Sequence, residues 1–82
     1  MNLENYTKEQ LVLMTINRAY SYTEQVIVEY SPSSYCNLII SGIWLDEAEA
    51  ITAKIEHFKV FKLHKEITNL SGDKKRLIFE AN

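Results

Sequence analysis

The sequence predicts an α+β fold in which two helices pack on one antiparallel sheet, in the order helix, strand, strand, helix, strand, strand. Two stretches carry apolar residues with a period of about 3.6 behind a helix-capping signal, and the other stretches alternate apolar and polar residues. The 82 residues are 46% hydrophobic and include only two Gly and one Pro, which is typical of a compact, ordered chain. We therefore interpret residues 1–82 as a single domain built from two helix-plus-β-hairpin units.

The first helix is predicted from a capping box, because Thr7 is followed three residues later by Gln10. The helix should begin at Lys8 and run to about Tyr20. The apolar side chains along this segment form one stripe that can face a core. The stripe consists of Val12, Leu13, Ile16, Ala19 and Tyr20.

A β-branched run over residues 25–30 predicts the first strand, with Val26, Val28 and Tyr30 on one face and Ile27 on the other. The residues that follow, 31–34, form a turn around Pro32, because proline cannot continue the hydrogen-bonded ladder. A second strand is therefore expected over residues 35–44.

This second strand has apolar side chains on both predicted faces, which is typical of a central strand that is covered on two sides. Strict alternation places Leu38, Ile40 and Trp44 on one face and Ile39 and Ile43 on the other. Gly42 favours a bulge or a bend within it. We expect Trp44 to fill the core.

The second helix is predicted from Asp46 as N-cap with Glu49 three residues later, so that it begins at Glu47. Its apolar positions recur at helical spacing. They are Ala48, Ile51, Ile55 and Phe58. Residues 51–57 also alternate as a strand would, and a strand is the alternative for that segment.

Residues 61–67 alternate apolar and polar side chains and predict a third strand. No Gly, Pro or Asn separates it from the preceding helix, so a single long helix over residues 47–69 is the alternative. Residues 69–73, centred on Ser71 and Gly72, form a turn, and residues 75–80 form the last strand.

A strand followed by a short glycine-containing motif carries a family resemblance. Residues 26–30, the run Ile40-Ser41-Gly42-Ile43 and the pair Leu45-Asp46 resemble the strand and Gly-x-Ile…Ile-Asp pattern of the YolD-like proteins of Firmicutes and their phages. The spacing after Gly42 is shorter than in that family, and the helix-favouring residues 47–56 stand where the family has a turn and another strand. The resemblance covers about residues 8–70 and implies the alternative fold, a small barrel with an N-terminal helix.

Residues that carry catalytic or metal chemistry are sparse. The candidate nucleophile is Cys36, and the candidate bases are His57 and His64. The spacing from Cys36 to either histidine matches no catalytic motif. These three residues are also too few and too scattered for a structural zinc site. Gly42 and Gly72 lie thirty residues apart, which excludes a glycine-rich phosphate loop. We expect no enzyme activity, no metal and no cofactor.

The compartment is predicted from the single cysteine and from hydropathy. Cys36 has no intramolecular disulfide partner, residues 1–9 are polar and acidic, and the longest apolar stretch, residues 38–45, is far shorter than the roughly 20 residues of a membrane helix. We expect a soluble, cytoplasmic protein that does not contact membranes. Frequent Ile, Lys, Asn and Tyr suggest a low-GC genome, such as that of a Firmicute or its phage.

Charge and aromatic residues are the remaining indications of function. Residues 1–50 carry two bases against seven acids, whereas residues 51–82 carry seven bases against four acids. Two groups of side chains are therefore candidates for contacting a partner. The basic group is Lys59, Lys62, Lys65, Lys74, Lys75 and Arg76, and the aromatic group is Tyr22, Tyr30 and Tyr35.

We therefore expect a small non-enzymatic protein-protein interaction module, plausibly a phage or accessory protein. Such a protein would bind a larger host macromolecule, for example a component of a defence system, and inhibit or modulate it. The alternative is a nucleic-acid-binding protein that uses the basic C-terminal half. A homodimer is also a plausible state, because a domain of this size has a thin core.

Overall fold

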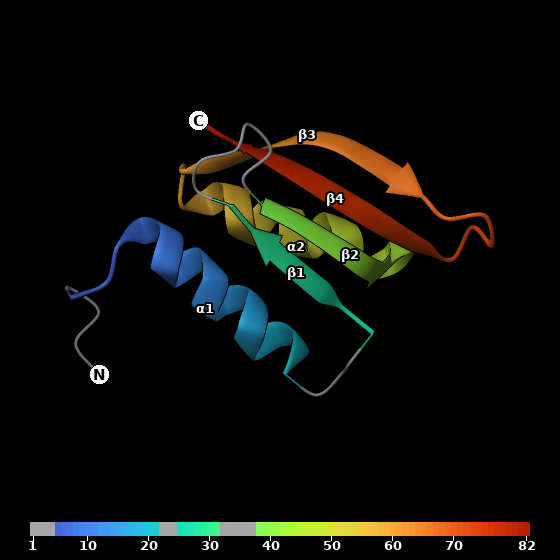
Figure 1. The fold of residues 1–82 in the computed structure, drawn as a ribbon, viewed down its shortest axis with the longest axis horizontal. Coiled ribbons are helices and arrows are strands. Elements are labelled where there is room, and N and C mark those ends of the chain that lie inside the picture. Colours follow the sequence, from blue (N-terminus) through green and yellow to red (C-terminus); the bar gives the residue numbers. More distant parts are fainter. Residues whose placement is uncertain (1–4, 22–24, 32–37) are drawn as a thin grey trace.

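The computed structural model describes residues 5–21, 25–31 and 38–82. In these residues two helices and four strands follow one another, and the strands form one antiparallel sheet in the order β1-β2-β4-β3 (Figure 1). The predicted α+β class is confirmed. The elements are α1 (Lys8–Tyr20), β1 (Ile27–Tyr30), β2 (Leu38–Trp44), α2 (Leu45–His57), β3 (Phe61–Thr68) and β4 (Lys74–Ala81).

The core lies between the two helices and one face of the sheet. Its buried side chains come from α1, α2 and the three longer strands, and they form one cluster. The sheet stays open, with β1 and β3 at its edges, so the barrel alternative is wrong. The buried cluster is Val12, Ile16, Leu38, Ile40, Ile43, Ala48, Ile51, Ile55, Phe61, Leu77 and Phe79.

The predicted start of α1 is confirmed. The Gln10 backbone N–H donates to the Thr7 hydroxyl oxygen at 3.1 Å, and the Thr7 backbone N–H donates to the Gln10 side-chain oxygen at 2.8 Å. Val12 and Ile16 of the predicted stripe are fully buried. The stripe therefore directs α1 onto the core, as the helical period requires.

The prediction that β2 is covered on two sides, with Trp44 in the core, is wrong. The register along β4 shifts between Ser41 and Ile43, so Gly42 is an extra residue in β2, a β-bulge. Beyond the bulge the alternation is inverted: Ile43 is fully buried, whereas Trp44 is 43% exposed. One extra residue has moved the two side chains to the opposite faces from those expected.

The start of α2 differs from the prediction. The helix begins at Leu45, immediately after β2, and Trp44 at the N-cap makes no side-chain capping bond. The Leu45 backbone N–H instead donates to the Asp73 backbone oxygen at 3.2 Å. Asp46 therefore lies inside the first turn, where its charge complements the helix dipole. The strand alternative for residues 51–57 is wrong.

Residues 58–60 connect α2 to β3, and one of them, Lys59, has an unusual backbone conformation. Lys59 adopts a left-handed φ of 60°, and its backbone N–H donates to the Glu56 oxygen at 3.0 Å. This geometry ends the helix and redirects the chain into β3. The alternative of one long helix over residues 47–69 is therefore wrong.

Some predictions concern residues that the structure does not describe, and others differ from it only in the ends of strands. The turn around Pro32, the beginning of the second strand at residues 35–37, and Tyr22, Tyr35 and Cys36 lie outside the described residues. Within the described residues β1 begins at Ile27 instead of residue 25, and β4 extends one residue beyond the predicted strand at each end.

Candidate interaction surface

One face of the sheet packs on the helices, and we call the opposite face the open face. Four isoleucines lie on it. Side chains alternate between the two faces along a strand, so a residue next to a core-facing residue is on the open face. Residues directly opposite each other on neighbouring strands share a face. We call these four the isoleucine patch. The patch consists of Ile27, Ile39, Ile67 and Ile78.

The strand register fixes the arrangement of the patch. Ile39 of β2 is directly opposite Ile78 of β4. In the next row, Ser41 is opposite Ile27 on one side and opposite Arg76 on the other, and Arg76 is opposite Ile67. Since cross-strand partners lie about 5 Å apart, Ser41 and Arg76 are framed by isoleucine side chains.

A second bulge gathers lysines on the open face. The register between β3 and β4 shifts between Leu63 and Lys65, which makes His64 the extra residue. In a regular strand Lys62 and Lys65 would point to opposite faces, because they are three residues apart. With the bulge, Lys62 is opposite Glu80 and Lys65 is opposite Ile78, and both are on the open face.

The structure divides the predicted basic group. Four of its six members lie on the open face, namely Lys62, Lys65, Lys74 and Arg76. Lys75 lies on the helix side, where its Nζ is 3.3 Å from Glu66 Oε2. Lys59 is in the turn between α2 and β3. The open face is therefore basic, although less so than the whole group predicts.

Some of these cations are already paired. Lys62 Nζ is 3.4 Å from Glu80 Oε1, and Lys74 Nζ lies 4.6 Å from the ring centroid of Trp44 and donates to Gln25 at 3.1 Å. Within the described part of the chain, Lys65 and Arg76 form no ion pair. These two cations are available to an anionic group from outside.

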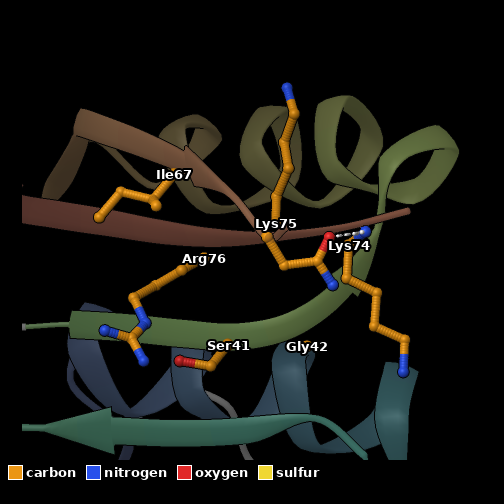
Figure 2. A pocket seen from close by; sticks show the side chains of 7 residues that line it. Ser41, Gly42, Ile67, Lys74, Lys75 and Arg76 are labelled. Carbon is orange, nitrogen blue, oxygen red and sulfur yellow. Dashed lines mark hydrogen bonds between the residues drawn. The ribbon is translucent and has the colours of Figure 1, made fainter. Parts of the chain in front are cut away.

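A depression of about 340 Å³ opens on this face beside Arg76. Figure 2 shows the Arg76 side chain extending from β4 across β2, with the Ser41 hydroxyl next to it and both helices behind the strands. Ser41 Oγ is buried and has no hydrogen-bond partner among the described residues. The lining residues are Ser41, Gly42, Ile67, Asn69, Lys74, Lys75 and Arg76.

The turn between β3 and β4 holds one wall of this depression. The Asn69 side-chain oxygen accepts from the backbone N–H groups of Asp73 and Lys74 at 3.2 and 3.3 Å, and its amide donates to Asp73 Oδ1 at 2.9 Å. The side chain of Leu70 stands at the tip of this turn, fully exposed. The turn is therefore a braced structure that presents an apolar tip to solvent.

Exposed apolar side chains lie near the turn between β3 and β4. Leu45 and Trp44, at the junction of β2 and α2, are 41% and 43% exposed. They lie beside the β3–β4 turn, because the Leu45 backbone N–H bonds to Asp73. Trp44 is opposite Lys74 on the open face, whereas Leu45 lines a depression on the helix side together with Glu66 and Lys75.

The one aromatic candidate that the structure describes, Tyr30, lies elsewhere. Tyr30 is half-buried on the helix side of β1, where its ring contacts Phe61 edge to face with centroids 6.1 Å apart. Sequence reasoning named Tyr30 as a contact residue, assigned Trp44 to the core, and did not consider the four isoleucines or Ser41 as contact residues. The glycine at position 42 was the one signal that could have revealed Trp44, because a bulge there inverts the alternation.

Both histidines lie in the described part of the chain. His64 Nδ1 is 3.6 Å from Glu80 Oε2 on the open face, and the His57 ring packs on Phe58 at the end of α2. No cluster of three or more metal-ligating side chains occurs in residues 5–21, 25–31 and 38–82. Neither α1 nor α2, the helices described, has the length and apolar character needed to cross a bilayer.

We compared the chain with known protein families, with curated proteins and with solved structures, and none of the three comparisons finds a match. The geometry of the open face is therefore the basis on which a function can be argued.

Proposed function

We propose that this protein is a non-enzymatic protein-binding module and that it binds its partner through the open face of the sheet. The observation that carries the proposal is the isoleucine patch around Arg76 and Ser41, which neither α1 nor α2 covers. Contiguous apolar surface of this kind, surrounded by polar groups, marks interaction sites in soluble proteins.

The composition of the face also supports a protein partner. Trp and Arg are over-represented among the residues that dominate binding energy at protein interfaces. Trp44 and Arg76 are both exposed here, beside apolar side chains that can exclude water from them. The biological role that we propose is that of a phage or accessory protein that occupies a surface of a larger host macromolecule and inhibits or modulates it.

A second candidate function is nucleic-acid binding. The observation in its favour is the presence of Lys62, Lys65, Lys74 and Arg76 on one face, since cations of this kind contact phosphates. Its test is a salt titration with single-stranded and duplex DNA. The candidate requires an affinity that falls steeply as ionic strength rises.

Affinity capture with matched variants tests the protein-binding function. Biotinylated wild-type protein is used to recover partners from a low-GC bacterial lysate, alongside Ile27→Asp on the open face and Ala50→Asp on the exposed side of α2. Circular dichroism establishes that both variants are folded. The proposal expects a partner recovered with wild type and with Ala50→Asp, but lost with Ile27→Asp. Equal recovery with both variants would contradict it.

A further inference from the structure

We propose that the partner presents an acidic amphipathic helix to the open face, and that one carboxylate of this helix binds between Arg76 and Ser41. This inference rests on the proposed protein-binding function and specifies the chemistry of the partner. Its starting point is the pairing of Ser41 with Arg76 in the middle of the isoleucine patch.

Hydrogen-bond donors converge at this point of the sheet. The Arg76 guanidinium has no ion-pair partner in the described residues, and the Ser41 hydroxyl there makes no hydrogen bond although its oxygen is buried. A guanidinium fork with a hydroxyl beside it is suited to a group with two acceptor oxygens. A carboxylate meets the guanidinium directly, and it satisfies both donors once the side chains that close off the buried Ser41 oxygen make room for it.

Further charge on the face favours an acidic segment over a single acid. Lys65 has no carboxylate partner among the described residues, and Lys74 is held by Trp44 and Gln25. Carboxylates one helical turn apart on a partner can meet Arg76 and Lys65 or Lys74, which lie in adjacent register rows. The acids Glu29 and Glu80 are at the margins, and Glu80 is already paired with Lys62.

The shape of the face suits a helix. Four strands about 4.8 Å apart give a face roughly 14 Å wide, and a helix with its side chains is about 10–12 Å across. Ile39 and Ile78 are opposite each other in the middle, with Ile27 and Ile67 at the two edge strands. Apolar side chains of the partner helix can therefore contact the isoleucine patch while its carboxylates reach the cations.

A second copy of the chain does not fit this face. A two-fold dimer formed sheet on sheet would bring Arg76, Lys65 and Lys74 of both copies into one interface, where like charges repel. The acidic first turn of α2 could meet the open face of another copy, but that contact is head to tail and gives rings or open-ended filaments instead of a two-fold dimer. The charges of the face therefore select a different protein.

Nucleic acid is also a poorer fit than an acidic helix. Proteins that bind single strands on a sheet stack bases on aromatic rings. The described open face offers two rings at its margins, the indole of Trp44, which lies against Lys74, and the imidazole of His64 beside Glu80, while its centre is built from isoleucines. Phosphate contacts alone would leave the isoleucine patch uncovered.

The test uses three probes and the fluorescence of Trp44, which is the only tryptophan of the chain. The first probe is a synthetic helical peptide with one leucine face flanked by glutamates. The second is the same peptide with glutamine at every glutamate, and the third is oligodeoxythymidine. Backbone amide chemical shifts are recorded in parallel, so that the surface that binds each probe is located directly.

The expected result is that the glutamate peptide binds, shifts the amides of the isoleucine patch and changes the fluorescence of Trp44. Arg76→Gln should weaken this binding about tenfold or more, because it removes a charged hydrogen-bond donor. The matched control Lys54→Gln, on the exposed side of α2, should leave it unchanged. The glutamine peptide should bind weakly, with no difference between wild type and Arg76→Gln.

Several outcomes would overturn the inference: equal affinity for both peptides, tighter binding of oligodeoxythymidine, or shifted amides confined to the helix side. The two proposals can fail separately. If the glutamate peptide does not bind while Ile27→Asp still abolishes partner capture, the open face is the binding surface but its partner is not an acidic helix. If Ile27→Asp also retains the partner, both proposals fail.

Discussion

Gly42 shows how much a single residue decides in this fold. Its φ of +83° lies in the left-handed region, and a Cβ at this position would collide with the backbone oxygen of Gln25, next to β1. Glycine is therefore required twice over, once for backbone conformation and once for space. The bulge it allows places Ile43 in the core and Trp44 on the open face.

Gly42→Ala is expected to destabilise the protein by at least about 2 kcal/mol, since it adds a steric clash to the cost of a left-handed residue. Gly72→Ala is the matched control, because Gly72 has a φ of +76° but open space around the Cβ position. That change should cost only about 1 kcal/mol. Urea denaturation of the two variants measures the difference, and equal losses would show that the approach of Gln25 is unimportant.

Lys59 is the opposite case, a side chain at a position that favours glycine. Its φ of 60° ends α2, so Lys59→Gly should stabilise the protein by about 1 kcal/mol through relief of backbone strain. Lys59→Ala retains the strain and serves as the control. Urea denaturation midpoints of both variants check this prediction, provided that the unfolding free energy depends on urea concentration with the same slope in both. A loss of stability in Lys59→Gly would contradict it.

At the scale of elements, the hairpin of β3 and β4 supplies most of the cations on the open face. Its second bulge, at His64, brings Lys62 and Lys65 to one side, and its turn is braced by the side chain of Asn69. The turn also supplies the acceptor for the first backbone N–H of α2. The hairpin therefore couples the helix start to the geometry of the depression.

Asn69→Ala removes three side-chain hydrogen bonds from this turn and should cost about 1–2 kcal/mol, since each exposed bond contributes little on its own. Ser71→Ala, at the exposed tip, is the control and should be nearly neutral. Amide hydrogen exchange provides the second measurement. Faster exchange is expected at Lys74 and at Leu45 in Asn69→Ala, whereas unchanged exchange at Leu45 would argue against the coupling.

At the scale of the whole molecule, acidic and basic side chains lie on different sides. The first turn of α2 carries Asp46 and Glu47, whereas the open face carries Lys65, Lys74 and Arg76 around the isoleucine patch. We expect these cations to keep this apolar face from pairing with a copy of itself, since like charges would meet in a sheet-on-sheet dimer. They would then act in solution as well as in the proposed binding.

The double variant Lys65→Leu/Arg76→Leu should associate with itself at micromolar concentrations, because it leaves the isoleucine patch without its repelling charges. The matched control is Lys8→Leu/Lys54→Leu, which removes two exposed charges from the helix side. Size-exclusion chromatography with light scattering measures both. If the two variants behave alike, the charges of the open face do not control self-association.

The sequence by itself determined the α+β class, the capping box at Thr7 and Gln10, and the stripe of α1 that faces the core. These features depend on residues a few positions apart, so local spacing is sufficient to predict them. The separation of acidic and basic halves was likewise readable, and four of the six predicted basic residues lie together on the open face.

The tertiary structure alone decided which side chains share that face. A strand repeats every two residues, so one extra residue inverts every position beyond it, and whether a residue is extra depends on its register with a distant strand. The bulges at Gly42 and His64 are set by pairing with β4, which lies far along the chain from β2. Trp44 and the Ser41–Arg76 pair owe their positions on the open face to that long-range register, whereas Lys65 owes its position to the bulge within the β3–β4 hairpin.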